Sequence, residues 1–547
     1  MSLVIFYKNK LFCETKKNNK YFFCVGKKID DIKKRISLIL KFNALNTYFI
    51  NKSYICNVLR VFKTKVFTMT TNYGIHKQLL IFLLGVSIEF LFFSCNNVVE
   101  EPDMPPQQIE LHSGYNVQLY SVSGNVNWGS DNPAVATVSS TGLVTAVGAG
   151  KAAIYTYTSV EDKNIICYLD VLPRRNILFY IGADEYLING DAPGKINKIR
   201  SGWEPGKGEM LIYIDRQNSG ASLLRIDETI GDNGLYKLDT LHLYGSENSA
   251  DPDVLKRVIN TVNTEYPADS YGMIFFSHGS GWLPSGTLNS PRSLVIDKGS
   301  SMEMEYSDFA AAIPDGQFDF IILEACLMAD VMFMYDLRNK ADYVLASSAE
   351  IVQPGFTDIY EEKVMSLFDT RSTVSTVLSS FAQAYYDTVT TQYGEIDAYC
   401  SVTMSLMKMD EMEKLAQATK NALNGIDIYE ENIEDIYNIQ SFDRPNTGTF
   451  GWQRPRCRFF DLTHTMENIV PDAEYRSFLE QMNKTVIWKA STKRFLLGNL
   501  QNGQPNYSEY DGFMINRHCG LTTYIKQDAY PYLNSKFEES SWYKSIR

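Results

Sequence analysis

Two short apolar runs, each followed by a residue that can do chemistry, constrain the fold of this chain most strongly. The first run reads MIFFS and precedes His278, and the second reads FIILEA and precedes Cys326. Runs of this length that are rich in Ile, Phe and Leu are typical of strands buried on both faces of a parallel sheet. A polar residue just past such a strand lies at the carboxyl edge of the sheet, where open α/β folds place their sites. We therefore expect His278 and Cys326 to be neighbours in space.

Length and composition limit the class of protein. At 547 residues the chain is too long for one compact core, so two or more domains are expected. A hydrophobic share of 45% is sufficient for globular folding, and a net charge of −12 argues against a nucleic-acid partner, which requires a basic surface. The nine cysteines form no CxxC pair and no Cys/His cluster at metal-ligand spacing, so we expect no metal site.

The amino-terminal residues predict export. Residues 1–68 show no helical or strand period, and we expect them to be absent from the mature protein. Residues 69–94 have a short polar start and then the apolar run LLIFLLGVSIEFLFFS, which is typical of a secretory signal peptide. The run ends at Ser94-Cys95, which resembles a bacterial lipobox, so Cys95 is the predicted lipidation site. The alternative is a buried or anchor helix with an incidental cysteine.

A lipoprotein signal would fix the compartment. Translation would then start at Met69, and residues 95–107, which are polar and contain proline, would form a tether. We expect an exported protein that is lipid-anchored to the bacterial cell envelope, at the outer membrane or the cell surface. The membrane is an expected partner through that anchor.

Residues 108–172 predict a small all-β domain. Short β-branched runs alternate with the turn sequences SDNP, SSTG and GAGK, at the spacing of an all-β sandwich. The sequence from Trp128 through Gly150 resembles the bacterial immunoglobulin-like domain of the group 2 type, which implies a spacer or adhesion module. Cys167 falls in the last expected strand, and we expect its thiol to be packed in the core.

Residues 174–547 predict an α/β domain. NILFYIGA and EMLIYIDR read as buried strands, and DPDVLKRVINTVNTEYP reads as a helix capped by Asp251 with Pro252 in its first turn. MIFFS, FDFIIL and DYVLASS read as further strands, separated by a short helix at 308–313 and the helix LMADVMFMYDLRN. This alternation implies a mainly parallel sheet sandwiched by helices.

His278 and Cys326 have the chemistry of a nucleophile and its base. A cysteine nucleophile needs a neighbour that raises its thiolate fraction and donors that stabilise an oxyanion. His278 would serve as that neighbour, while Gly279 and the amide of Cys326, at the start of the expected helix, would donate N–H groups. A lone His at a strand end or a lone Cys after an apolar run is more often structural. Their combination favours a catalytic role, because a caspase-like order places the histidine about 50 residues before the cysteine, as in this chain.

The motifs Ser277–Trp282 and Glu324–Ala329 resemble the two catalytic motifs of the clostripain family of cysteine peptidases, relatives of gingipains, legumains and caspases. The resemblance extends over most of residues 175–547. It implies a caspase-like α/β fold with His278 and Cys326 as the catalytic dyad and Gly279 in the oxyanion hole.

The resemblance also implies a substrate preference. Family members usually cleave after Arg or Lys, and an acidic residue two places before the cysteine helps to line that pocket. Glu324 stands at this position, and Glu350 is a second candidate whose alternative is an exposed loop carboxylate. Relatives are commonly activated by a cut between the two motifs, so Arg292 is the self-cleavage candidate. No cofactor is expected, although calcium use varies among relatives.

Two interpretations of the whole chain remain. The first is a cell-envelope cysteine endopeptidase that acts on protein or peptide substrates through the Cys-His dyad. The second is a catalytically inactive surface adhesin or binding lipoprotein built on the same fold. Retention of both reactive residues favours the enzyme. His242, His464 and His518 are expected to be structural. The pairing of the five cysteines that follow Cys95 stays open: Cys167, Cys326, Cys400, Cys457 and Cys519.

Overall fold

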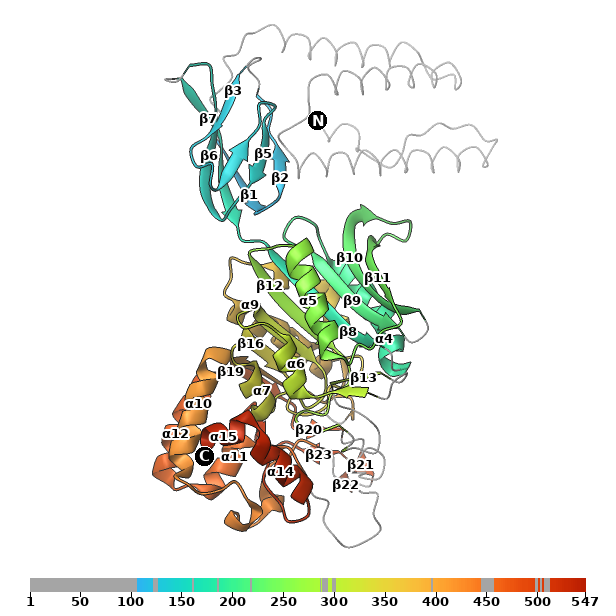
Figure 1. Ribbon diagram of the computed structural model, residues 1–547, viewed down its shortest axis with the longest axis vertical. Coiled ribbons are helices and arrows are strands. Elements are labelled where there is room, and N and C mark those ends of the chain that lie inside the picture. The colour runs from blue at the N-terminus through green and yellow to red at the C-terminus, as the bar shows by residue number, and fades with distance from the viewer. Residues whose placement is uncertain are drawn as a thin grey trace, which may run out of the picture. The chain divides into compact units, whose positions relative to one another are not determined.

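The computed structural model describes residues 106–121, 126–159, 162–183, 186–216, 219–285, 287, 294–297, 302–394, 397–443, 457–496, 500–501, 504–505 and 512–547. The predictions for the signal peptide, Cys95 and Arg292 lie outside these residues. The described chain comprises a small β domain and a larger α/β domain, which are described separately (Figure 1).

The small domain is a sandwich of two sheets, as its turn spacing predicts. One sheet has the order β1-β7-β6-β3 and the other the order β2-β5-β4. The Cys167 thiol is buried in the core between them, which confirms a packed cysteine, and burial raises its pKa to about 11. The strands are β1 (Gln107–His112), β2 (Asn116–Gln118), β3 (Asn127–Ser130), β4 (Ala136–Val138), β5 (Leu143–Ala146), β6 (Gly150–Tyr157) and β7 (Lys163–Leu172).

The large domain is organised around a nine-stranded sheet of order β11-β10-β9-β8-β12-β15-β16-β17-β19. The central strands β9, β8, β12, β15 and β16 pair in parallel, as expected from their apolar runs. The outer strands pair antiparallel, which the sequence analysis did not predict. The strands are β8 (Arg175–Ala183), β9 (Met210–Arg216), β10 (Gly220–Ile230), β11 (Tyr236–Gly245), β12 (Ser270–Phe276), β15 (Phe318–Glu324), β16 (Ala341–Ala346), β17 (Thr403–Lys408) and β19 (Val486–Ser491).

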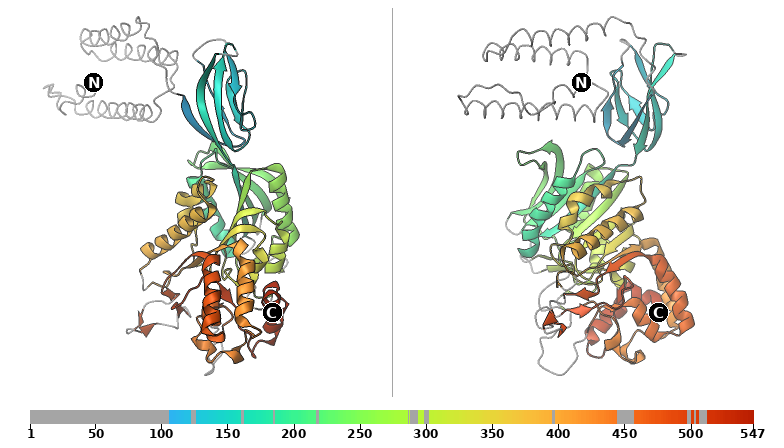
Figure 2. Two further views of the ribbon diagram at one scale, coloured as in Figure 1. Left: turned by 90° about the vertical axis from the view of Figure 1, so that its left-hand side faces the viewer. Right: turned by 180° about the vertical axis from the view of Figure 1, so that it is seen from behind.

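Helices cover both faces of this sheet, which confirms the expected sandwich (Figure 2). One apolar core lies between the sheet and helices α5 (Pro252–Glu265), α6 (Tyr306–Ala312) and α7 (Val331–Leu337). A second core lies on the other face, under α4 (Tyr186–Gly202), α8 (Thr357–Lys363) and α9 (Val374–Gln392). Alternate residues of each central strand enter the two cores, because side chains point to opposite faces along a strand.

Two helices test the sequence analysis at the level of single residues. Helix α5 begins as predicted, with the Asp251 side chain accepting a hydrogen bond from the Asp253 N–H. Helix α7 begins at Val331, four residues later than expected, because the Asp330 side chain caps it through the Met332 N–H at 2.9 Å. The expectation that the Cys326 amide lies at a helix start is therefore wrong.

Smaller elements complete the large domain. The remaining helices are α10 (Met412–Leu423), α11 (Leu462–Ile469), α12 (Asp472–Thr485), α14 (Pro531–Glu539) and α15 (Ser541–Ile546), with 3₁₀ turns η1 (Val364–Phe368), η2 (Met409–Glu411), η3 (Glu430–Asn432) and η4 (Ile436–Asn438). Two-stranded ladders join β13 (Leu294–Asp297) to β14 (Met302–Met304), β18 (Phe460–Asp461) to β24 (Thr522–Thr523), β20 (Arg494–Phe495) to β23 (Phe513–Met514), and β21 (Leu500–Gln501) to β22 (Gln504–Pro505).

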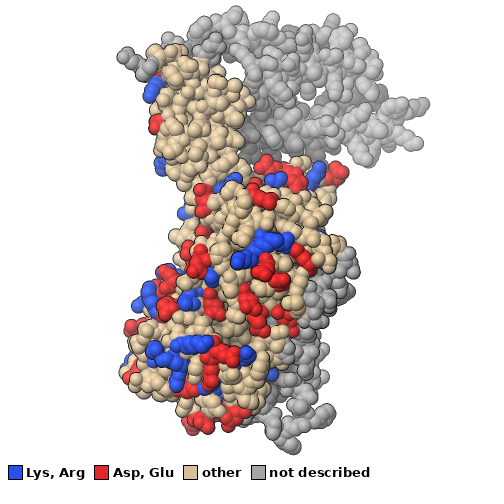
Figure 3. All heavy atoms as spheres, viewed as in Figure 1, with Lys and Arg blue, Asp and Glu red and all other residues tan. Residues whose placement is uncertain are grey.

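The distribution of surface charge and the hydropathy of the helices bear on function. Basic and acidic side chains are interspersed on the face of the large domain drawn in Figure 3, without one sign dominating. Within the part of the chain that the structure describes, no helix is both long and apolar enough to cross a membrane.

Candidate active site

The strand register places His278 and Cys326 at the same point of the sheet edge. Strands β12 and β15 pair in parallel, and Phe276 lies opposite Glu324 as the last pair of the ladder. His278 and Cys326 each follow two residues later in their own chain segments. Since neighbouring strands lie about 4.8 Å apart, the two segments leave the sheet side by side. Both residues are half-buried, so each side chain keeps contact with solvent.

Two glycines after His278 let its loop lie directly against the cysteine segment. A Cβ atom built on Gly279 would lie 2.7 Å from the Cys326 carbonyl oxygen. A Cβ on Gly281 would lie 2.6 Å from the Leu327 carbonyl oxygen, and Gly281 has a φ of +60°. A side chain at either position would separate the loops, so the two glycines allow the His278 loop to contact the backbone of the Cys326 segment.

The Cys326 segment is fixed by backbone bonds to the loop that follows β16. The Leu327 N–H donates to the Ala349 carbonyl at 2.8 Å, and the Ala329 N–H donates to the Ser347 carbonyl at 2.9 Å. Leu327 has a φ of 63°, a left-handed conformation that is costly for a leucine and that turns the chain directly after Cys326.

The sulfur of Cys326 has a backbone donor. The Ile351 N–H lies 3.4 Å from the Cys326 Sγ. The loop at 349–351 therefore contacts the cysteine sulfur through its backbone.

Tyr385 of α9 is a further neighbour of the site that the sequence analysis did not identify. Burial, followed by the charges of Glu324 and Cys326, raises the pKa of this tyrosine well above its usual value. The side chain is buried and packs edge-on against Phe356. Its position on the apolar face of a helix gave no signal in the sequence, because tyrosine is common there.

Glu324 has contacts that differ from the expected open pocket. Its side chain is 1% exposed, and its Oε1 atom lies 2.6 Å from the Lys195 Nζ atom. The same Oε1 accepts the Phe356 N–H at 2.7 Å, and Oε2 accepts the Tyr360 hydroxyl at 2.7 Å. In this structure the carboxylate is held inside the protein by its own cation.

Lys195 was missed because its helix, α4, contains Gly190, Pro193 and Gly194 and was not predicted as a helix. It occupies the apolar face of α4, since it lies three residues after Ala192 and four before Ile199, both of which are buried. A lysine at helical spacing within an apolar stripe is a signal that could have been read, because such a cation needs a buried partner.

Glu350 lies in the loop that holds Cys326. It follows Ala349, whose carbonyl accepts from Leu327, and precedes Ile351, whose N–H faces the sulfur. Glu350 is half-buried. The structure thus places Glu350 in the backbone segment that contacts the Cys326 segment.

The three histidines expected to be structural all have polar contacts. His242 pairs with Glu265, and His464 accepts a hydrogen bond from the Gln440 N–H. His518 Nε2 lies 3.2 Å from the Ser348 Oγ, and burial lowers the pKa of His518 to about 4, which keeps the ring neutral. Of the cysteines whose pairing was open, Cys167, Cys457 and Cys519 carry thiols that form no disulfide.

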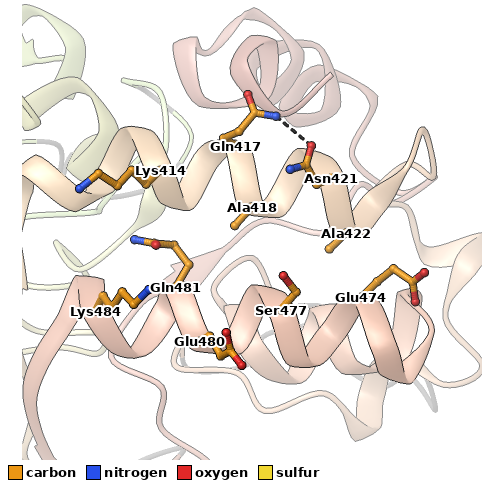
Figure 4. A pocket seen from close by; sticks show the side chains of 10 residues that line it. All are labelled: Lys414, Gln417, Ala418, Asn421, Ala422, Glu474, Ser477, Glu480, Gln481 and Lys484. Carbon is orange, nitrogen blue, oxygen red and sulfur yellow. Dashed lines mark hydrogen bonds between the residues drawn. The ribbon is translucent and has the colours of Figure 1, made fainter.

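Among the residues described there is no candidate metal centre, and the groove that the structure shows lies away from His278 and Cys326. The described residues contain no group of three or more His, Cys, Asp or Glu side chains placed to hold a metal ion. A groove of about 510 Å³ lies between α10 and α12, and polar side chains such as Lys414, Gln481 and Glu480 line it (Figure 4). Neither His278 nor Cys326 contributes to this groove.

A mainly parallel sheet core covered by helices, with a cysteine and a histidine at one edge, defines the class of caspase-like cysteine peptidases. Comparison of the sequence with protein families gives the same result. The Clostripain family matches residues 179–541, and the bacterial Ig-like domain (group 2) matches residues 112–163. The chain belongs to the clostripain family.

Individual relatives agree with this assignment. Over 263 residues the chain is 26% identical to clostripain from Hathewaya histolytica. The matched region covers 41% of this chain and 50% of clostripain. The chain thus spans about half the length of that relative.

Solved structures cover the large domain more completely. An inactive zymogen C11 protease from Parabacteroides distasonis is 27% identical with a TM-score of 0.56, covering 69% of this chain and 98% of that one. A secreted C11 cysteine protease from Bacteroides thetaiotaomicron, solved in complex with an irreversible peptide inhibitor, is 28% identical with a TM-score of 0.55. The match covers 68% of this chain and 98% of that one.

Proposed function

We propose that this protein is a cysteine endopeptidase of the cell envelope that hydrolyses peptide bonds after Arg or Lys through a Cys326–His278 dyad. The observation that supports the proposal is the register of β12 and β15, whose last pair, Phe276 and Glu324, lies two residues before His278 and Cys326. Membership of the clostripain family supports the reaction class.

The chemistry is acyl transfer in two steps. The Cys326 thiolate attacks the scissile carbonyl carbon, and the N–H of Gly279 stabilises the resulting oxyanion. His278 gives its proton to the leaving amine as the C–N bond breaks, which leaves a thioester on Cys326. His278 then takes a proton from water, whose oxygen attacks the thioester and releases the acid and the thiolate.

Peptide hydrolysis tests this proposal. Wild type should cleave short reporter peptides that end in Arg or Lys, whereas Cys326→Ala and His278→Ala should each lose activity by at least about 10³-fold. Circular dichroism and urea unfolding check that both variants fold. Folded wild type without activity on any reporter would favour the alternative, an inactive adhesin or binding lipoprotein.

Self-cleavage after Arg292 is proposed as the activating step, because the loop between the two motifs carries this basic residue. Purified wild type should separate into two fragments with a new amino terminus at Ser293, and Arg292→Gln should stay intact. The same two fragments in a Cys326→Ala preparation would show that another protease makes the cut.

Anchoring through Cys95 is proposed from the lipobox resemblance at Ser94-Cys95. Cells that express the full chain and are fed a labelled fatty acid should label the wild-type protein but not Cys95→Ala. A mature amino terminus upstream of Met69 would contradict the proposed start and signal peptide.

A further inference from the structure

We propose that His518, Thr522 and Tyr524 are positioning residues that hold the three loops of the candidate active site in place. This inference rests on the proposed function, because it concerns the geometry of the same dyad. The three loops are the Cys326 segment, the loop at 347–351 and the His278 loop. The three positioning residues lie in one short stretch, the 518–524 segment, which includes β24.

Thr522 bonds to the Cys326 segment through both its backbone and its side chain. The Thr522 N–H donates to the Ala329 carbonyl at 2.8 Å, and the Thr522 Oγ1 lies 3.3 Å from that carbonyl oxygen and 3.3 Å from the Asp330 Oδ2. All three residues are fully buried, so water cannot take over these bonds. Because the Ala329 N–H donates to the loop at 347–351, Ala329 is held from two sides, three residues after Cys326.

His518 contacts the loop at 347–351. Its Nε2 atom lies 3.2 Å from the Ser348 Oγ. The carbonyl groups of both neighbours of Ser348 accept N–H groups of the Cys326 segment, at 2.8 and 2.9 Å. Ser348 is buried, so its hydroxyl has no access to a substrate, and its contact with His518 serves to position the loop. This contact therefore fixes the loop between the two carbonyls that hold the Cys326 segment.

Tyr524 contacts the His278 loop through an aromatic pair. The ring centroids of Trp282 and Tyr524 lie 4.7 Å apart, and both side chains are buried. The Tyr524 hydroxyl donates to the Asn534 Oδ1 at 2.8 Å, so helix α14 fixes the orientation of this ring. Trp282 follows His278 by four residues. The aromatic pair therefore holds the His278 loop against the 518–524 segment.

The 518–524 segment is itself attached to the large sheet and to a helix. The Ser405 Oγ of β17 donates to the Gly520 carbonyl at 2.6 Å, and the Asp461 Oδ2 accepts the Cys519 N–H at 2.7 Å. The other oxygen of Asp461 caps helix α11, and β24 pairs antiparallel with β18. The segment is therefore a fixed support, and a change within it is transmitted to the loops.

A small displacement of these loops affects the reaction more than the fold. A misplacement of about 1 Å at the reacting atoms costs about 10²-fold in rate. Replacing Thr522 by valine keeps the shape of the side chain and the N–H bond to Ala329, but it removes the hydroxyl. We therefore expect part of that loss in Thr522→Val.

Steady-state hydrolysis of a reporter peptide tests the Thr522 hydroxyl. In Thr522→Val we expect kcat to fall by about tenfold while KM changes by less than about twofold, since a displaced nucleophile affects the chemical step and not substrate binding. Thr522→Ser restores a hydroxyl and should return kcat to within about threefold of wild type.

Thr523→Val is the matched control. Thr523 is equally buried in the same strand, but its side chain points to the opposite face and donates to the Tyr524 carbonyl at 3.4 Å. Its kcat should stay within about twofold of wild type. Urea unfolding shows that every variant is folded under the assay conditions.

Alkylation of Cys326 by iodoacetamide gives a second measurement that needs no peptidase activity. The thiolate is the reacting form, so a cysteine displaced from His278 should react more slowly at neutral pH. We expect the rate constant to fall by at least about threefold in Thr522→Val and to stay unchanged in Thr523→Val. Mass spectrometry of the peptide that carries Cys326 measures the rate.

Two results would overturn the inference: equal kcat values in Thr522→Val and Thr523→Val, or an alkylation rate constant in Thr522→Val that equals that of wild type. Wild type that is alkylated at Cys326 but cleaves no reporter would instead refute the proposed function. The comparison of alkylation rates would then still decide the inference.

Discussion

The Nζ atom of Lys195 lies 2.6 Å from Oε1 of Glu324, and both side chains are 1% exposed. This ion pair joins helix α4 to the end of strand β15, two residues before Cys326. Buried charges of this kind stabilise a fold only as a pair, because either one alone has lost its hydration without compensation.

Lys195→Met should therefore destabilise the protein strongly. We expect the free energy of unfolding to fall by about 3–5 kcal/mol, the usual result of removing one partner from a buried pair. Adding Glu324→Gln should recover most of this loss. Urea unfolding followed by circular dichroism measures both. Lys198→Met, which breaks the exposed pair with Glu361, should cost at most about 1 kcal/mol. Equal losses in Lys195→Met and Lys198→Met would refute the prediction.

Gly355→Ala should lower the free energy of unfolding more than Gly316→Ala, although both glycines have a similar positive φ. Gly316 has a φ of +65° and nothing within 4 Å of the position where a Cβ would lie, so Gly316→Ala should cost only the left-handed strain, about 1–2 kcal/mol. At Gly355 the new methyl group also meets Glu324 Oε1, which should add about 1–3 kcal/mol. Thermal and urea unfolding of the two variants give the comparison, and similar losses would contradict the close approach.

Gly279→Ala should reduce catalysis more than stability. Its methyl group would lie 2.7 Å from the Cys326 carbonyl oxygen and would push the His278 loop away from the nucleophile. A displacement of this kind can cost about 10²-fold in kcat. Steady-state hydrolysis of an Arg reporter measures the effect. Gly190→Ala in helix α4, where nothing lies within 4 Å, is the control and should keep wild-type rates. An unchanged kcat in Gly279→Ala would contradict a close contact between the His278 loop and the Cys326 segment that matters for catalysis.

Asp330 should make stability depend on pH. Burial raises the pKa of this carboxyl from 3.8 to about 8 in the folded protein. The folded chain therefore holds a proton that the unfolded chain releases between these values. Its stabilising contribution is complete below pH 3.8 and is lost as the pH rises to about 8.

Asp330→Asn removes this titration and keeps an oxygen that can accept the Met332 N–H. We expect the stability of the variant relative to wild type to increase by up to about 1.4 kcal/mol per pH unit between about pH 5 and pH 7. Urea midpoints at several pH values in this interval measure the difference. A difference that does not change with pH would show that Asp330 is already ionised in the fold.

Much of the sheet could be predicted from local pattern. The strands around NILFYIGA, MIFFS and FDFIIL are continuous apolar runs, and such runs suit strands buried on both faces. The antiparallel edge strands were not predicted, since β10 and β11 leave the sheet core and end in exposed residues such as Ile230 and Leu243. The start of α7 was placed too early because a left-handed Leu327 has no signature in an apolar run.

The sequence by itself determined the buried central strands, the family and the two residues that we propose as the catalytic dyad. An apolar run predicts a buried strand, and a Ser-His-Gly or Glu-Ala-Cys motif resembles a family whether or not its partners in space are known. The tertiary structure decided which charges meet. Lys195 and Glu324 are separated by more than a hundred residues, and only packing of α4 against the end of β15 brings them into contact at 2.6 Å. A carboxylate at the position of Glu324 can face a substrate or pair with a cation of the protein itself. Which of the two occurs depends on the position of helix α4, which no local sequence pattern relates to Glu324.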